Sequence, residues 1–580
     1  MSSEDAWLID TVPSRRLPVY TRFNANDVLP DPITPLGASL AWLPHIFAGY
    51  SLAYAEVGSS TLAEATGDEV WPAAAFFYGH LYVNVTMARL SGVRSGIGWQ
   101  AVDEAFFGSH PDAPPHAARP ADDDPVAKAR YGERIQWALT ATEYPDLEED
   151  RALARAAHAA RPDLATLSAG GLVARARSMM PYERLLWRGE VIAGSLAAIG
   201  PAVARQAVAG LPGVNIVDLI GPAGEVVSAA PSFVLWDLSR MVRSDPALTQ
   251  AFDLGSDGLA DRLATQPEFA ASFTRFLADY GYRGPSEWDL GAASWESHPE
   301  LALALVDRLR FLDDGASPSS RRDQQATRTA ETVRRVEALI GDDAERLQTL
   351  RQGLESARRF AGWRERGKSN CIRVLHEARM ALRELGRRLH AAGALAEPEH
   401  VFMALDDELD TLVLAPQTLS ERLAERHRQW LDLFGLDVPL FVSGTEPMLP
   451  LSAIPRLHQS EVAAAPAGTV LSGEPCSAGT ARGRARTVTD PASAQAFEPG
   501  EVLVAPQTDP SWTPLFLVAS AVVVEVGALA SHAMIVSREL GIPCVAGIPN
   551  ITSLLRDGTD VEVDGARGTV TVHAGEGVPV

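Results

Sequence analysis

The sequence predicts a multidomain protein, with a mainly α-helical body followed by a compact α/β domain. At 580 residues the chain is too long for one hydrophobic core and should form two to four domains of roughly 100–200 residues each. Apolar residues recur at three- and four-residue spacing through most of 130–275 and 300–392, which predicts helices. After a Pro/Ala-rich passage the spacing becomes alternating, which predicts strands. We therefore expect a helical domain over 1–442, a linker over 443–468 and an α/β domain over 469–580.

The start of the body is expected to be irregular. Three prolines punctuate residues 17–60, and Asp31–Pro35 is typical of a rigid turn before a helix. A stretch rich in glycine, proline and aromatic residues at 280–290 interrupts the helical pattern. The second helical region is amphipathic at its end and should stop at Gly393.

One segment matches the phosphate-loop pattern G-x-x-x-x-G-K-[ST] letter for letter, from Gly362 to Ser369. Such a loop needs a buried apolar strand before it and a backbone that wraps closely around phosphate. Here the preceding residues are charged and helical in pattern, and the intervening residues are bulky. The segment is therefore interpreted as a break between helices, with arginines facing a cleft or solvent.

Short strands are expected to alternate with helices in the C-terminal domain. The strands are predicted over 481–489, 501–506, 522–526, 543–547 and 560–573, and the helices over about 513–520, 532–541 and 551–556. Ser531 stands where the N-cap of the second helix belongs, so His532 falls in the first turn. The helix dipole disfavours a stable cation there, whereas free backbone N–H groups favour a phosphoryl group. On local chemistry alone, His532 is either phosphorylatable or structural.

The composition indicates a soluble globular protein in reducing surroundings. The 51 basic and 74 acidic side chains give a net charge of −23, which argues against nucleic acid as a partner. Cys371, Cys476 and Cys544 lie far apart in sequence, so neither a disulfide framework nor a metal site is expected. The first residues lack a signal-peptide pattern, and no apolar run reaches the length of about 20 residues that a membrane span needs. We expect a cytoplasmic protein with no membrane partner.

The segment from Gly527 to Pro543 resembles the swivelling phosphohistidine domain of the phosphoenolpyruvate-utilising family. The family pattern is a Gly-Gly turn, Ser-His, an apolar helix, Ala-Arg-Glu and Gly-Ile-Pro, and here only Ala528 and Ser537 differ. Two further family patterns precede it, Thr-Asp-Pro-x-Trp-x-Pro at 508–514 and the opening pattern at 477–483. The resemblance implies a compact α/β swivelling domain that carries a phosphoryl group on His532. It also implies supporting roles for Thr508, Asp509, Trp512, Gly527, Ser531 and Arg538.

The body is similar to the acceptor-binding domain of rifampicin phosphotransferase, a member of this family, at residues 29–36, 78–84, 280–287 and 400–409. The resemblance implies that Arg283 holds the phosphoryl group and that Glu287 orients it or takes the acceptor's proton. A structural ion pair between these two residues is the alternative. Tyr282 stands where family members commonly have histidine, which argues against rifampicin itself as the acceptor.

Aromatic residues of the body would supply a largely apolar acceptor pocket. The candidate substrate-binding residues are Tyr78, Tyr82, Tyr282 and Trp288. Further aromatic side chains that could line such a pocket are those of Trp71, Phe76 and Phe77. Core packing is the alternative role for all of these. The expected substrate is a small hydroxylated organic molecule, a phenol or an alcohol.

The family's ATP-grasp region and its barrel for phosphoenolpyruvate are not recognisable in this sequence, which has only two lysines, Lys128 and Lys368. The arrangement resembles phenylphosphate synthase and 4-methylphenyl phosphate synthase, where ATP-grasp and phosphohistidine functions lie on separate subunits. We therefore expect Mg²⁺ and ATP to bind an ATP-grasp subunit in trans, which converts ATP to AMP and phosphate and phosphorylates His532. The alternatives are a non-catalytic phosphocarrier or regulatory protein phosphorylated on His532, and a self-sufficient kinase that uses Gly362–Ser369.

Overall fold

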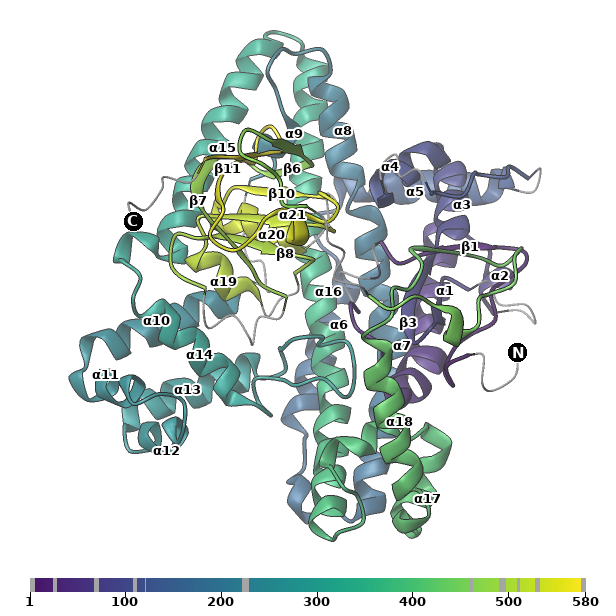
Figure 1. Cartoon of the computed structure of the whole chain (residues 1–580). Helices are drawn as coiled ribbons and strands as arrows, with labels where there is room; N and C mark the ends of the chain where they lie inside the picture. Colours follow the sequence, from purple (N-terminus) through teal and green to yellow (C-terminus); the bar gives the residue numbers. More distant parts are fainter. Residues whose placement is uncertain are drawn as a thin grey trace. The chain divides into compact units, whose positions relative to one another are not determined.

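The chain folds into two compact units, each assembled from segments that are distant in sequence (Figure 1). The computed structural model describes residues 6–23, 25, 29–66, 72–107, 112–119, 122–221, 229–457, 463–489, 497–508, 512–526 and 532–574. The first unit comprises Met1–Leu196, Ser286–Ala292 and Arg366–Gln459, and the second comprises Ala197–Pro285, Ala293–Glu365 and Ser460–Val580. The helices between 197 and 365 therefore group with the C-terminal α/β domain, rather than with the rest of the helical body.

A small antiparallel sheet and a set of helices form the first unit. The sheet has the order β2-β3-β1-β4, with strands β1 (Val19–Thr21), β2 (Ala74–Phe77), β3 (His80–Asn84) and β4 (Phe441–Ser443). The helices are η1 (Gly37–Ile46), α1 (Phe47–Val57), α2 (Leu62–Thr66), α3 (Val85–Ser95), α4 (Trp99–Phe107), α5 (Pro125–Thr140), α6 (Pro145–Ala159), η3 (Leu164–Thr166), α7 (Ala169–Leu196), η5 (Pro398–Met403), η6 (Asp406–Glu408), α17 (Leu409–Leu414), η7 (Pro416–Thr418), α18 (Ser420–Leu433) and η8 (Leu451–Ala453).

The expectation of an irregular segment over 17–60 is wrong from Gly37 onward. A π-helix, η1, follows the predicted Asp31–Pro35 turn and continues directly into α1. Pro44 lies inside η1 and cannot donate a backbone hydrogen bond, which disfavours a regular α-helix at this point. Burial of most of η1 outweighs that local disadvantage, which sequence patterns alone do not show.

Helix α16 (Ala344–Ala391) runs without interruption through the phosphate-loop match. Gly362–Ser369 is helical throughout, so the expected break between helices is wrong, and these residues form no phosphate loop. Gly367 permits a close approach to α7, because a Cβ at this position would lie 2.9 Å from the Cα of Glu190. A Cβ at Gly362 would meet nothing within 4 Å.

The second unit combines helices with an eight-stranded mixed sheet. The helices are α8 (Ile199–Val208), α9 (Ile216–Leu219), α10 (Ala230–Ser244), α11 (Pro246–Asp253), α12 (Leu259–Ala264), α13 (Pro267–Tyr280), α14 (Pro299–Leu309), η4 (Asp314–Ala316), α15 (Pro318–Ile340), α19 (Thr513–Val518), α20 (His532–Leu540) and α21 (Ile551–Leu554). The strands are β5 (Val470–Ser472), β6 (Glu474–Ser477), β7 (Thr480–Thr487), β8 (Val502–Ala505), β9 (Ala521–Val524), β10 (Cys544–Ala546), β11 (Asp560–Asp564) and β12 (Thr569–Val572). The predicted strands over 481–489, 501–506, 522–526 and 543–547 and the three predicted helices of this domain are confirmed within a few residues. The single strand predicted over 560–573 is wrong, because β11 and β12 form an antiparallel pair there, and β5 and β6 were not predicted.

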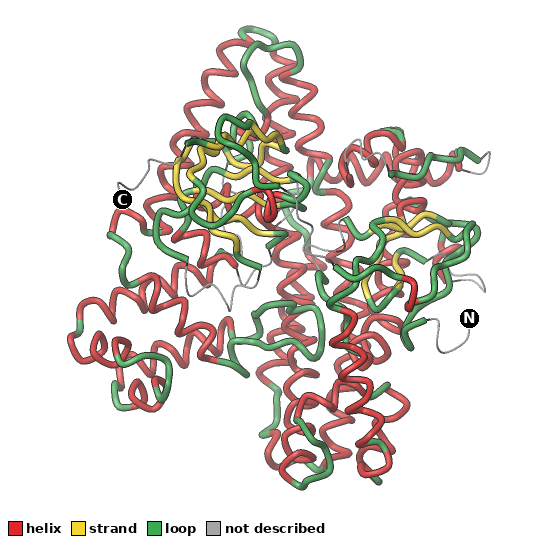
Figure 2. The backbone as a smooth tube through the Cα atoms, in the orientation of Figure 1, coloured by secondary structure: helices red, strands yellow, loops and turns green. Residues whose placement is uncertain are grey.

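The sheet of the second unit has the order β5-β12-β11-β7-β8-β9-β10-β6, and β7 to β10 are parallel. Figure 2 shows its strands in yellow among red helices. Strands β8 and β9 are buried along their whole length, as is typical of parallel strands covered on both faces. Leu503 and Val522 point to the face where α19 and α20 pack, and Val502 and Val523 point to the face of α21. Helix α20 therefore covers one face of the sheet. Because it follows β9 in the chain, it starts from the carboxyl edge of the parallel strands.

A continuous apolar cluster joins the α19–α20 face of the sheet to helices α10–α14. It includes Leu235, Trp236 and Phe276 from those helices and Phe516 and Met534 from α19 and α20. Helix α15 also packs against α20. The sheet domain and the helices α10–α15 are therefore parts of one packed core.

One helical run in the described part of the chain, Ala169–Val208, is long and apolar enough to cross a membrane by length and composition alone. Of its most apolar 18-residue window, 44% is buried inside the structure. The run spans α7 and α8.

Candidate functional site

His532 is the first residue of α20, as the sequence predicts. The chain reaches it from β9 through residues 527–531, so the helix begins beyond the carboxyl end of a buried parallel strand. Ligands of α/β sheets bind at this edge, and the N-terminus of a helix favours an anion. Gly527 and Ser531, and the side chain of His532, lie outside the described residues. Their predicted roles stay predictions.

The loops that follow β8 and β9 are joined at the same edge of the sheet. The backbone N–H of Glu525 donates to the carbonyl of Ala505 at 3.1 Å, and that of Val526 donates to Pro506 at 3.0 Å. The β8 loop carries Thr508 and Trp512, which are 3% and 4% exposed. Both of these predicted supporting residues therefore belong to the same edge as His532, whereas Asp509 lies outside the described residues.

Arg538 braces α20 against the neighbouring strand β6. Its Nε donates to the carbonyl oxygen of Cys476 at 3.0 Å, and its guanidinium also contacts the sulfur of Met534. Burial lowers the pKa of Arg538, while the nearby thiols and Glu539 act in the opposite direction. Six residues separate Arg538 from His532, about 9 Å along a helix. These contacts give Arg538 a positioning role for α20.

In the first unit, three of the four body segments that carry the family resemblance meet around residues 286–291. The side chain of Asp289 accepts hydrogen bonds from the N–H of Thr34 at 2.9 Å and from its hydroxyl at 2.6 Å. The Ser286 hydroxyl donates to Asp31 at 2.8 Å, and the N–H of Ile33 donates to the carbonyl of Gly79 at 2.9 Å. These contacts join three segments, at 29–36, 78–84 and 286–291.

The segment at 400–409 closes on the same place. A Cβ at Gly291 would lie 3.4 Å from the ring of Phe402, so glycine permits this approach. Arg383 donates to the carbonyl of Gly291 at 2.8 Å, and its guanidinium carbon lies 5.5 Å from the centre of the Phe402 ring. Three of the resembling segments, at 29–36, 78–84 and 400–409, therefore form one cluster with residues 286–291, whereas residues 280–285 of the remaining segment belong to the second unit.

Glu287 lies in this cluster, and its side chain is 1% exposed. The guanidinium of Arg379 donates to the backbone carbonyl of Glu287 at 2.5 Å and to that of Asp289 at 2.9 Å. Burial lowers the pKa of Arg379 to about 10, while the charges of Glu287 and Asp289 act to raise it. Glu287 is thus held beside a buried guanidinium, which suits a residue of fixed orientation.

Tyr282 and Arg283 lie in the second unit, in a loop closed by backbone hydrogen bonds. The carbonyl of Arg283 accepts from Trp295 at 2.8 Å, and that of Gly281 accepts from Glu296 at 2.8 Å. Tyr282 and Arg283 are each 3% exposed, and the guanidinium carbon lies 5.8 Å from the centre of the Tyr282 ring. The chain passes from the second unit to the first between Pro285 and Ser286, so the two predicted catalytic residues Arg283 and Glu287 belong to different units.

Tyr78 and Tyr82 both belong to the β2–β3 hairpin, Tyr78 in its turn and Tyr82 in strand β3. Tyr78 and Gly79 have φ values of 55° and 76°, which form the two-residue turn that matches the twist of the strands. The hydroxyl of Tyr82 donates to the carbonyl of Pro439 at 2.7 Å, and burial raises its pKa. Tyr82 is therefore a core residue whose polar atom is already bonded.

The remaining aromatic candidates pack on one another. The ring centre of Trp288 lies 4.7 Å from that of Trp187, which lies 5.3 Å from Trp42, and Phe76 lies 6.1 Å from Trp42. The indole N–H of Trp42 donates to the carbonyl of Trp288 at 3.1 Å. Trp71 lies outside the described residues. A role for Trp288 and Tyr78 in binding an acceptor stays a prediction, and their burial shows that they also serve the core.

Sequence reasoning missed a buried charge cluster around Glu377 of α16. The carboxylate, with a side chain 0% exposed, accepts from His158 and Arg161 at 2.8 Å and from Arg175 at 3.1 Å. Burial alone would raise its pKa, but these hydrogen bonds outweigh it and lower the pKa from 4.5 to about 2. The partners lie over 200 residues away in sequence, so no local pattern could reveal the cluster.

The described residues hold no group of three or more His, Cys, Asp or Glu side chains arranged to bind a metal ion. The expectation that Mg²⁺ and ATP bind a separate subunit stays a prediction.

Two family profiles match the chain. Residues 188–365 match the rifampicin phosphotransferase fourth domain, and residues 497–568 match the mobile domain of phosphoenolpyruvate-utilising enzymes. The second match contains β8 to β11 and the whole of α20.

Several curated proteins are similar over much of the chain. An uncharacterised protein of Mycobacterium tuberculosis is 34% identical over 394 residues, which cover 67% of this chain and 42% of that protein. Rifampicin phosphotransferases of Streptomyces sviceus and Bacillus subtilis are 31% and 25% identical, over 60% and 63% of this chain and 40% and 39% of their own lengths. The chain thus matches about two fifths of the length of these relatives.

Proposed function

We propose that this chain, which belongs to the phosphoenolpyruvate-utilising family and resembles rifampicin phosphotransferase, carries a phosphoryl group on His532 to the hydroxyl of a small organic acceptor. The observation that carries the proposal is the place of His532. It begins a helix at the carboxyl edge of parallel strands, inside the region that matches the mobile domain. An anion at that position is stabilised by the unbonded N–H groups of the first helical turn.

In the first step, an ATP-grasp subunit with Mg²⁺ and ATP supplies the phosphoryl group. A phosphorus–oxygen bond of ATP breaks as a phosphorus–nitrogen bond forms on the imidazole of His532. Over the full cycle, ATP, water and the acceptor are converted to AMP, phosphate and the phosphorylated acceptor. The helical state of Gly362–Ser369 favours a nucleotide site elsewhere than in that segment, because a helix cannot surround a phosphate.

In the second step, the acceptor oxygen attacks phosphorus and the bond to His532 breaks. The proton of the acceptor hydroxyl passes to a base, for which we propose Glu287. Phosphoryl transfer needs positioning and positive charge more than covalent help from the protein, so Arg283 is the proposed group that holds the phosphoryl oxygens. A phenol or an alcohol is the proposed acceptor, in keeping with the aromatic cluster of the first unit.

The proposal is tested by reconstitution. Purified protein with Mg-ATP and a panel of phenols and alcohols should release no AMP, and addition of the ATP-grasp subunit should give AMP and a phosphorylated acceptor. Arg283→Gln should slow acceptor phosphorylation by about 100-fold or more, while phosphorylation of His532 continues. Lys368→Ala, on the uninterrupted helix α16, serves as the control and should change the rate only modestly.

Two outcomes would contradict this account. Formation of phosphohistidine from ATP by the chain alone, abolished by Lys368→Ala, would favour the self-sufficient kinase. Phosphorylation of His532 without thermal stabilisation by any acceptor, and without transfer, would favour the non-catalytic phosphocarrier.

A further inference from the structure

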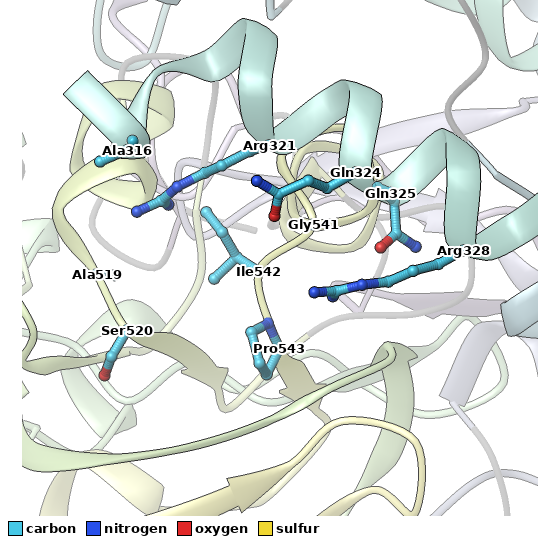
Figure 3. Close-up of a pocket in the computed structure, with 11 residues that line it drawn as sticks. Ala316, Arg321, Gln324, Gln325, Arg328, Ala519, Ser520, Gly541, Ile542 and Pro543 are labelled. Carbon is cyan, nitrogen blue, oxygen red and sulfur yellow. The ribbon is translucent and has the colours of Figure 1, made fainter.

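A cavity of about 350 Å³ lies within the second unit, between helix α15 and the sheet domain (Figure 3). Its residues are Gly315, Ala316, Arg321, Gln324, Gln325 and Arg328 on one side, and Ala519, Ser520, Gly541, Ile542 and Pro543 on the other. Pro543 and Gly541 follow α20, so the cavity lies at the opposite end of that helix from His532. It is therefore separate from the proposed site of phosphorylation.

The wall formed by α15 is polar and basic where a packing face is normally apolar. Residues 321, 324, 325 and 328 are spaced i, i+3, i+4 and i+7, so they share one face of the helix. Figure 3 shows their side chains directed toward the turn that carries Ile542 and Pro543. The next buried residues along this helix, Thr329 and Val336, are not among those that line the cavity. The polar group is thus confined to the cavity.

Arg321 and Arg328 have no acidic partner among the residues that the structure describes. Neither forms an ion pair there, although acidic side chains outnumber basic ones in the sequence, 74 to 51. Arg321 is half-buried, and burial lowers its pKa, with no carboxylate nearby to oppose the effect. A desolvated guanidinium gains most from a charge-assisted hydrogen bond to an anion.

The rest of the cavity suits an organic body attached to that anion. Ile542, Pro543, Ala316 and Ala519 provide apolar surface, and Gln325, which is 8% exposed, provides an amide. The volume lies at the lower end of the range found for small-molecule sites. Gly541 has a φ of 63°, and a Cβ there would lie 3.4 Å from the Cβ of Gln325, so the two walls approach closely beside the cavity.

We propose that this cavity binds a small organic anion, a carboxylate or a phosphate ester, through Arg321, Arg328 and Gln325. Because α15 supplies one wall and the sheet domain the other, the bound anion holds the two together. The site would then favour the state in which the mobile domain is packed on α15.

Calorimetric titration of the full chain with butyl phosphate, pentanoate and neutral pentan-1-ol tests the proposal. We expect either or both anions to bind and the alcohol not to bind, and the tighter anion identifies the headgroup. Arg328→Gln, on an exposed residue that should not affect folding, and Arg321→Gln should each weaken binding about tenfold or more. Arg334→Gln, on the same helix outside the cavity, is the matched control and should bind as the unmodified protein does.

A second measurement separates this site from the proposed function. His532→Ala should bind both anions unchanged, and bound anion should slow hydrogen exchange in 318–328 and 541–546. Equal affinity in the Arg321→Gln/Arg328→Gln double variant would overturn the proposal. So would the absence of binding at anion concentrations on the order of 10 mM.

Discussion

Glu377 shows how a single buried residue ties distant helices of the first unit together. Its carboxylate is held by His158, Arg161 and Arg175, and its pKa is lowered to about 2. A shift of this size from 4.5 corresponds to about 3 kcal/mol of stability. Because the pKa is depressed in the folded state, this stability is present above about pH 4.5 and is lost as the pH falls toward 2.

Glu377→Gln should therefore lower the free energy of unfolding by about 3 kcal/mol at neutral pH, and the difference from the unmodified protein should shrink below pH 5. Urea unfolding followed from pH 7 down to the acid limit measures both. Glu355→Gln, on the exposed side of the same helix, is the control and should change stability by less than about 0.5 kcal/mol. A difference that does not vary with pH would contradict the assignment.

The position of a residue within its helix or strand was predicted correctly where that position depends on neighbouring residues in the sequence. His532 was predicted at the start of a helix because a glycine turn and a capping residue precede it, and the structure places it there. Tyr82 was proposed for substrate binding because an aromatic side chain looks the same in a pocket and in a core. Only the bond from its hydroxyl to Pro439 identifies the core role, and that partner lies 357 residues away.

At the scale of elements, α16 shows how tertiary packing overrides local signals. The segment Gly362–Ser369 was interpreted as a break between helices, yet the helix continues from Ala344 to Ala391. Close packing of Gly367 on α7 supplies the reason, since this contact exists only when both helices are formed. The α/β domain was predicted more accurately, because its buried parallel strands are short apolar runs separated by clear turn residues.

The two glycines of α16 should respond to alanine in opposite ways. Gly367→Ala should destabilise the protein by about 1–3 kcal/mol, because the new Cβ would be forced against the backbone of Glu190. Gly362→Ala should stabilise it by up to about 1 kcal/mol, since the Cβ enters open space and alanine favours the helix. Thermal or urea unfolding of the two variants provides the comparison. A functional phosphate loop would instead lose nucleotide binding with either change.

At the scale of the whole molecule, both family matches contribute to the second unit. Residues 188–365 supply helices α8 to α15, and 497–568 supply most of the sheet domain. The apolar cluster between α10–α14 and α19–α20 means that a movement of the sheet domain must break this contact or carry those helices with it. This coupling was not visible in the sequence, because the two regions are separated by about 200 residues.

The predicted linker over 443–468 is tied at both ends. In the first unit, Gly444 donates to Pro18 at 2.7 Å and Leu457 to Gly435 at 2.8 Å. In the sheet domain, Ala465 donates to Leu554 at 2.9 Å and Gly468 to Val572 at 2.8 Å. Only 458–462 lie outside the described residues. The predicted linker is therefore not a free tether along its whole length, because hydrogen bonds hold residues near each of its ends.

The proposal that His532 carries the phosphoryl group is tested by locating the phosphate in the chain. The protein is incubated with Mg-ATP and the ATP-grasp subunit, digested at alkaline pH, which preserves phosphohistidine, and analysed by mass spectrometry. We expect phosphate on His532, no labelling of a folded His532→Ala variant, and normal labelling of His573→Ala, a matched change in the same domain. Equal labelling of His532→Ala, or phosphate located on another residue, would contradict it.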